Sequence, residues 1–172
     1  MGKCYVTRSK TTAYGSDALT RARFKGVRFT EDTLATLTGE CLCGSIKFSL
    51  ADEFLYSFYC HCSECRRFSG SAFSVAGGIQ KENLTISSGK EHVRYYQKRD
   101  VSNMAFCNLC GSSLFSENFR KDLLHIRLGV LNEEPSLKPQ AHVFVGSKVP
   151  WYQITDDLPQ FETIPPSKNN ET

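Results

Sequence analysis

Hydrophobic and polar residues alternate along several short stretches of the chain, a period of two that is typical of half-buried β-strands. The clearest case is residues 45–50, in which every second residue is apolar. Further strands of similar length are predicted at residues 54–59, 73–76, 84–87, 92–96, 101–106, 124–128 and 142–145. Gly77-Gly78, Ser88-Gly89 and Gly111 are predicted to separate them. The pattern indicates a mainly β domain.

Helical patterns are few, and they cover residues 63–68 and 17–24. A chain of 172 residues fits one domain, which we place at residues 35–164. A basic arm, residues 1–34, precedes it. Residues 1–30 of this arm hold seven basic residues and one acid, Asp17. A polar tail, residues 165–172, follows it. We expect both termini to be solvated.

Composition is that of a globular protein, with 40% hydrophobic and 23% charged residues. The formal net charge of +3 is too small to favour a polyanionic partner, so nucleic acid is not the expected ligand. The sequence has no apolar run of membrane-spanning length and begins without a secretory h-region. We therefore expect no membrane association and a cytoplasmic protein, with a nuclear or mitochondrial location left open.

The spacing of the cysteines is the main indication of chemical function in this sequence. A reducing compartment disfavours structural disulfides, so eight cysteines favour metal binding or redox chemistry. Seven of them fall in three motifs with ligand spacing: Cys41-Leu-Cys43, Cys60-His-Cys-Ser-Glu-Cys65 and Cys107-Asn-Leu-Cys110. The eighth, Cys4, lies in the basic arm and is interpreted as a bystander.

Two of the motifs supply two sulfurs each, which together make the four ligands of a structural zinc site. Alternate residues of an extended segment point the same way, so Cys41 and Cys43 can face one ion. A tight turn brings Cys107 and Cys110 together, and Gly111 lets the backbone curl behind them. We predict that these four cysteines bind one zinc ion, which would contribute strongly to folding.

The remaining motif, Cys60, Cys62 and Cys65, has three sulfurs, and three protein ligands with one open position are typical of a reactive zinc site. His61 is predicted to face away, because its neighbours face the metal. The other histidines, His92, His125 and His142, lie in predicted strands and are assigned ordinary structural roles. The alternative is a closed, structural site whose fourth ligand comes from a His, an Asp or Cys4.

Charge narrows the chemistry of the three-sulfur site. Three thiolates around Zn²⁺ leave a net charge near −1, which weakens the ion as an acid toward water. A sulfur-rich centre suits the binding of a substrate thiolate or the polarisation of a small carbonyl. Thiol chemistry is therefore favoured over hydrolysis.

The three motifs, with the flanking residues Gly39, Gly44, Arg66, Arg67 and Phe106 to Ser112, resemble those of the glutathione-dependent formaldehyde-activating (Gfa) and centromere protein V family. The stretches 142–152 and 156–159 are similar to the closing segment of that family. The resemblance covers about residues 37–162. It implies a mainly β, Mss4-like β-tent of short antiparallel sheets around zinc sites, with two zinc ions per chain: a structural ion on Cys41, Cys43, Cys107 and Cys110 and a catalytic ion on Cys60, Cys62 and Cys65.

The activity implied by the resemblance is the condensation of glutathione with formaldehyde, classed in reverse as a carbon–sulfur lyase reaction. The open zinc position would take the thiolate or the aldehyde oxygen. Because glutathione is anionic, we expect cationic contacts from Arg66 and Arg67, with Lys98 and Arg99 as further candidates. Two alternatives stay open: an enzyme of this fold that acts on a different metabolite, and a non-enzymatic zinc module that binds nucleic acid or protein.

Overall fold

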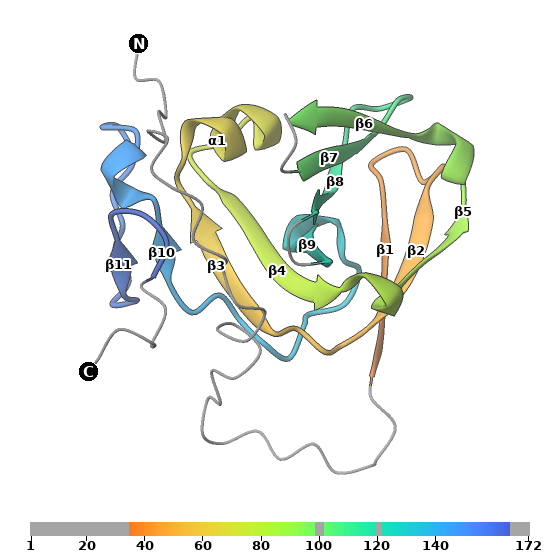
Figure 1. Ribbon diagram of the computed structural model, residues 1–172, viewed down its shortest axis with the longest axis horizontal. Coiled ribbons are helices and arrows are strands. Elements are labelled where there is room, and N and C mark those ends of the chain that lie inside the picture. The colour runs from red at the N-terminus through yellow and green to blue at the C-terminus, as the bar shows by residue number, and fades with distance from the viewer. Residues whose placement is uncertain (1–34, 99–101, 120–121, 166–172) are drawn as a thin grey trace. The chain divides into compact units, whose positions relative to one another are not determined.

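The computed structural model describes residues 35–98, 102–119 and 122–165, which form two β-sheets and one short α-helix (Figure 1). The predicted mainly β fold is confirmed. The basic arm, its predicted helix at residues 17–24, and the tail beyond Pro165 lie outside the described residues. None of the helices in the described ranges has the length and apolar character needed to cross a membrane.

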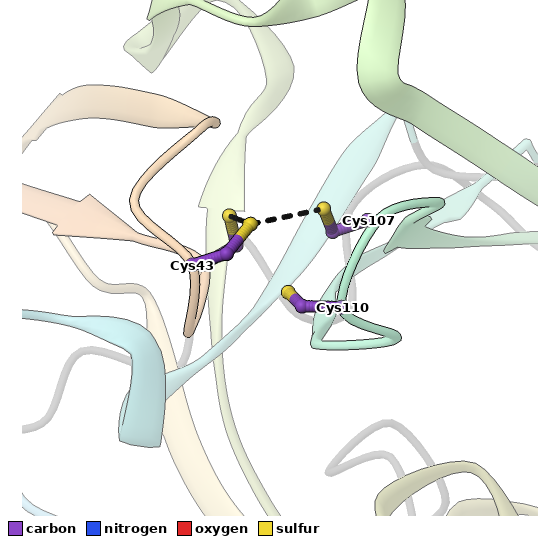
Figure 2. A group of neighbouring side chains, drawn as sticks. Cys43, Cys107 and Cys110 are labelled. Carbon is purple, nitrogen blue, oxygen red and sulfur yellow. Dashed lines mark hydrogen bonds between the residues drawn. The ribbon is translucent and has the colours of Figure 1, made fainter.

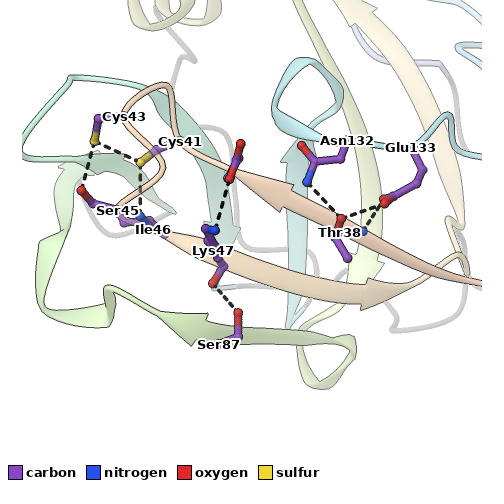
Figure 3. Close-up of polar contacts among 10 residues, drawn as sticks. Thr38, Cys41, Cys43, Ser45, Ile46, Lys47, Ser87, Asn132 and Glu133 are labelled. Atoms are coloured by element: carbon purple, nitrogen blue, oxygen red, sulfur yellow. Dashed lines mark hydrogen bonds and ion pairs between the residues drawn. The ribbon is translucent and has the colours of Figure 1, made fainter.

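The smaller sheet has three antiparallel strands in the order β1-β2-β5. Their bounds are Thr36–Glu40 for β1, Lys47–Ala51 for β2 and Leu84–Ser88 for β5. The hydroxyl of Thr38 on β1 donates to the Glu133 carboxylate at 2.8 Å and accepts from the Asn132 amide at 3.0 Å (Figure 3). These contacts fasten the smaller sheet to the loop that joins β9 and β10 of the eight-stranded sheet.

The larger sheet has eight strands in the order β11-β10-β3-β4-β9-β8-β7-β6. Their bounds, in chain order, are Tyr56–Cys60 for β3, Ser74–Gln80 for β4, Val93–Lys98 for β6, Ser102–Cys107 for β7, Ser113–Asn118 for β8, Leu123–Arg127 for β9, His142–Val143 for β10 and Gln160–Phe161 for β11. β10 pairs in parallel with β3 and with β11, whereas the other neighbours are antiparallel.

The helix α1, Ser63–Ser69, follows β3 directly and leads back into β4. Gly70 ends it in the left-handed conformation (φ 61°), with its amide bonded to the Arg66 carbonyl, a common way for a helix to stop. Single 3-10 turns occur at Lys81–Asn83 (η1), Lys90–His92 (η2), Leu128–Val130 (η3) and Val145–Ser147 (η4).

A single main hydrophobic core joins the two sheets. Its buried side chains come from both of them and include Phe48 and Leu50 of the smaller sheet and Ile79, Leu114 and Ile126 of the larger one. A second, smaller cluster contains Cys60, Cys62 and Val143, with aromatic rings packed against it. The three-cysteine motif therefore has apolar surroundings of its own, apart from the main core.

The strand predictions were incomplete. β1, β8 and β11 were not predicted, and β4 runs through Gly77-Gly78, where a break was expected. The two glycines serve close packing, because a Cβ on them would lie 2.3 Å from the ring of Phe54 and 2.5 Å from that of Tyr56 respectively. They leave room for aromatic rings across the strand without ending it.

Candidate metal centres

The first candidate centre lies where two turns meet. Cys41 and Cys43 flank the tip between β1 and β2, while Cys107 ends β7 and Cys110 lies in the turn before β8 (Figure 2). The four sulfur atoms all lie within 4.8 Å of one another, and none of these cysteines is in a disulfide. One turn belongs to each sheet, so an ion held here would tie the two sheets together.

The sulfur geometry fits a tetrahedral ion. Four sulfurs about 2.3 Å from a zinc ion lie about 3.8 Å from one another. The Sγ atom of Cys43 lies 3.5 Å from the Sγ of Cys41 and 4.0 Å from the Sγ of Cys107. The backbone N–H of Ile46 donates to the Cys41 sulfur at 3.3 Å (Figure 3). Gly44 and Gly111 close the two turns with φ of 70° and 77°, a region that favours glycine.

Hydrogen bonding and burial act in opposite directions on the thiols of this group of four, and burial raises the pKa of Cys107 to about 11. Cys41 and Cys107 belong to the main core, whereas Cys43 is exposed. A hydrogen bond with the Ser112 hydroxyl, 3.3 Å away, lowers the pKa of Cys110 to about 6. A complete set of four sulfurs leaves no position for a substrate, which suits a structural role.

The second candidate centre comprises Cys60 at the end of β3, Cys62 at the N-cap of α1, and Cys65 within α1. Their sulfurs also lie within 4.8 Å of one another, and the backbone N–H of Cys65 donates to the Cys62 sulfur at 3.4 Å. Hydrogen bonds from the other two thiols lower the pKa of Cys62 to about 2, so it is the first to become a thiolate. Within the described ranges no His, Asp, Glu or further Cys joins this group.

His61 lies between two of these cysteines but its side chain takes part in a different structure. Its Nε2 is 2.8 Å from Nδ1 of His142, whose Nε2 is 3.1 Å from both carboxylate oxygens of Asp156. Because a carboxylate only accepts, the Nε2–H of His142 donates to Asp156, and its Nδ1 shares a hydrogen bond with Nε2 of His61. Both rings are buried, and this burial lowers the pKa of His61 to about 4. A hydrogen-bonded chain from His61 through His142 to Asp156 thus fixes the backbone between Cys60 and Cys62.

Comparison with known proteins supports a family assignment. A family model described as "Glutathione-dependent formaldehyde-activating enzyme" matches residues 36–147. The chain belongs to this family. A Podospora anserina protein named "Putative glutathione-dependent formaldehyde-activating enzyme" is 24% identical over 72% of this chain and 61% of its own length. An Aspergillus flavus protein of the same name is 31% identical over 44% of this chain and 40% of its own length.

The chain therefore spans about 40–61% of the length of these two relatives. A Rhodobacter sphaeroides protein of known crystal structure aligns with a TM-score of 0.49 and 22% identity, over 58% of this chain and 91% of that one.

In this member of the Gfa family, one face of the larger sheet carries polar side chains next to the three-cysteine group. Strand register places Tyr56, Gly78 and His125 in one row, and Phe58, Ala76 and Arg127 in the next. The Tyr56 hydroxyl lies 2.8 Å from Nε2 of His125, and burial raises the pKa of Tyr56 to about 12. Cys60 follows Phe58 on the same face.

Arg127 is a site residue that the sequence analysis missed. It ends β9, is only 6% exposed, and its guanidinium carbon lies 5.5 Å from the ring centre of Phe68 on α1. A charged residue at the end of a strand is usually solvated, so nothing in its local sequence distinguished it.

The cations proposed from sequence differ in their surroundings. Arg66 donates to the carbonyl oxygens of His61 at 3.1 Å and Ser147 at 3.2 Å, so its guanidinium already braces the backbone beside the three cysteines. Arg67 is exposed. Lys98 forms an ion pair with Glu64 of α1, and Arg99 lies outside the described residues.

Proposed function

We propose that this chain is a zinc-dependent enzyme that joins the thiol of glutathione to formaldehyde, and cleaves the same carbon–sulfur bond in reverse. Membership of the Gfa family supports the reaction class. The observation that carries the proposal is the group Cys60, Cys62 and Cys65, because it offers three sulfurs and no fourth ligand from the described residues. Such a group leaves one coordination position for a substrate.

Two zinc ions per chain are part of this proposal. Cys41, Cys43, Cys107 and Cys110 would hold the structural ion, and Cys60, Cys62 and Cys65 the catalytic one. When bound, the second ion supplies a Lewis acid with an open position, suited to a thiolate or an aldehyde oxygen.

The overall reaction needs no oxidant or reductant. The glutathione sulfur attacks the carbonyl carbon, a carbon–sulfur bond forms, and the carbonyl oxygen becomes a hydroxyl that receives the proton lost from the thiol. The reverse reaction returns that proton to sulfur as the bond breaks. The protein must therefore bring a thiol and a small carbonyl together and keep the sulfur ionised.

The length of glutathione limits which part of the larger sheet it can contact from the three-cysteine group. Tyr56 is four residues from Cys60 along an extended strand, which is about 13 Å at roughly 3.3 Å per residue. An extended tripeptide spans on the order of 10 Å, so a substrate whose sulfur lies at Cys60 reaches the row of Phe58 and Arg127 but falls short of the Tyr56–His125 pair. Of the two candidate arginines, Arg67 is exposed and suits a carboxylate better than Arg66, whose guanidinium is already bonded to backbone carbonyls.

The test measures adduct formation with purified, zinc-loaded full-length chain by exchange NMR of glutathione and formaldehyde. We expect acceleration above the uncatalysed rate, lost in Cys62→Ala together with one of two zinc ions. Cys4→Ser is the matched control, because it removes the one cysteine outside the three motifs, and it should retain activity and both ions. Wild-type protein that holds both ions without accelerating the reaction would refute the proposed substrate pair.

A further inference from the structure

The guanidinium of Arg127 is buried without a matching anion in its immediate contacts. Its three hydrogen bonds go to the hydroxyls of Ser113 and Ser116, at 3.3 and 3.4 Å, and to the carbonyl of His125, at 3.4 Å. All three acceptors are neutral, and all three contacts are long. Among the described residues, no carboxylate lies within ion-pair distance of it.

A buried charge without an opposite charge is costly, so the position of Arg127 requires an explanation. Burial alone lowers its pKa, and the negative charge of the cysteines at 65, 60 and 62 opposes that shift. The three-cysteine group is therefore the candidate opposite charge for Arg127, and the packing around Arg127 supports it.

Packing brings Arg127 to that group from two directions. The ring of Phe68, which contacts its guanidinium, is three residues after Cys65 on α1 and therefore lies on the same side of the helix. Across the sheet, Arg127 is paired with Ala76, which is paired with Phe58, two residues before Cys60 on the same face. The helix and the strand that supply the cysteines both meet Arg127.

We propose that Arg127 is the counter-charge of the three-cysteine metal site and thereby a positioning residue for its metal and for substrate thiolate. Three thiolates and Zn²⁺ carry −3 + 2 = −1, and the guanidinium brings the local sum to zero. A neutral site accepts an anionic thiolate at its open position, whereas an uncompensated anionic site repels it. Lys98 also interacts with the charges of Cys62 and Cys65, but its ion pair with Glu64 offsets its own charge. The inference rests on the proposed zinc site.

The experiment is a chelator titration of zinc-loaded full-length protein that follows both ions. We expect R127Q to release the three-cysteine ion at about 10- to 100-fold lower chelator strength than wild type, the usual range for groups that support metal ligands. The four-cysteine ion should be unaffected. R127K should restore most of the affinity because it keeps the charge. R94Q, which removes an exposed arginine on β6, is the charge-matched control and should behave as wild type.

Wild-type affinity in R127Q, or equal weakening in R94Q, would overturn the proposal. A second measurement applies if R127Q does not fold. In a Cys62→Ala background the group holds no metal, so Arg127 has no counter-charge. R127M in this background should raise the midpoint of urea unfolding above that of Cys62→Ala alone. A lowered midpoint would contradict the proposal. Neither measurement uses glutathione or formaldehyde, so absence of turnover would remove the proposed reaction and leave this inference standing.

Discussion

Replacing one sulfur of the four-cysteine group should destabilise the whole domain. Cys43 and Cys107 are 64 residues apart, and an ion between them closes a loop of that length. The loop-closure relation for cross-links gives about 4 kcal/mol for such a loop. Typical domains unfold with only about 5–15 kcal/mol. We therefore expect Cys110→Ala, in zinc buffer, to lose at least about 4 kcal/mol and to be largely unfolded or to precipitate.

The matched variant in the other group should behave differently. Cys60, Cys62 and Cys65 lie within six consecutive residues, and the same relation gives only about 2 kcal/mol for so short a loop. Cys62→Ala should therefore stay folded while it loses one of two zinc ions.

Urea unfolding followed by far-UV circular dichroism measures both variants, and metal content is determined on the same samples. Equal destabilisation by Cys110→Ala and Cys62→Ala would refute the reasoning, because it would mean that the three-cysteine group also holds the fold together. If both variants were as stable as wild type, metal binding by either group would make no contribution to the stability of the fold.

Three further results are expected. The free energy of unfolding of the wild-type protein should fall by up to about 2–3 kcal/mol as the pH rises from 10 to 12, because the raised Tyr56 pKa of about 12 gives stability that is complete below pH 10 and lost above it. Tyr56→Phe should abolish this loss. Gly78→Ala should cost about 1–3 kcal/mol by steric overlap with that ring, whereas Gly129→Ala, with open space, should cost little. Asp156→Asn should cost about 1 kcal/mol through its histidine partner, and Asp157→Asn almost nothing.

Each of these has a contradicting outcome. An alkaline stability profile of Tyr56→Phe that matches wild type would place the titration elsewhere. Equal thermal midpoints for the two glycine variants would deny the close approach of the ring. Equal shifts for the two aspartate variants would show that the histidine chain adds nothing to stability.

Local spacing made much of the candidate chemistry predictable. Metal ligands within two or three residues of each other are a property of the sequence itself, and strand 47–51 was visible because one of its faces is buried. β8 was not visible, since Leu114 and Phe115 are adjacent and both buried. The register shift opposite Ala105 and Phe106 leaves Leu114 as an extra residue on β8, which allows this departure from alternation.

Long-range contacts were beyond any local pattern. His61 and His142 are 81 residues apart, and their hydrogen bond depends on β10 pairing with β3. Arg127 depends on the sheet order that places β9 beside β4. Both were invisible because a charged or titratable residue within a strand has the same local sequence whether its partner is water or a buried group.

The parallel pairing of β10 with β3 has a consequence for synthesis of the chain. All seven clustered cysteines precede β10 in the chain, since the last of them is Cys110 and β10 begins at His142, so they leave the ribosome before it does. Until then β3, which carries Cys60 at its end, is an unpaired edge of the growing sheet and open to strand addition from other molecules. A translational pause before residue 142 would therefore favour aggregation through β3, and rapid delivery of the closing segment protects the three-cysteine group.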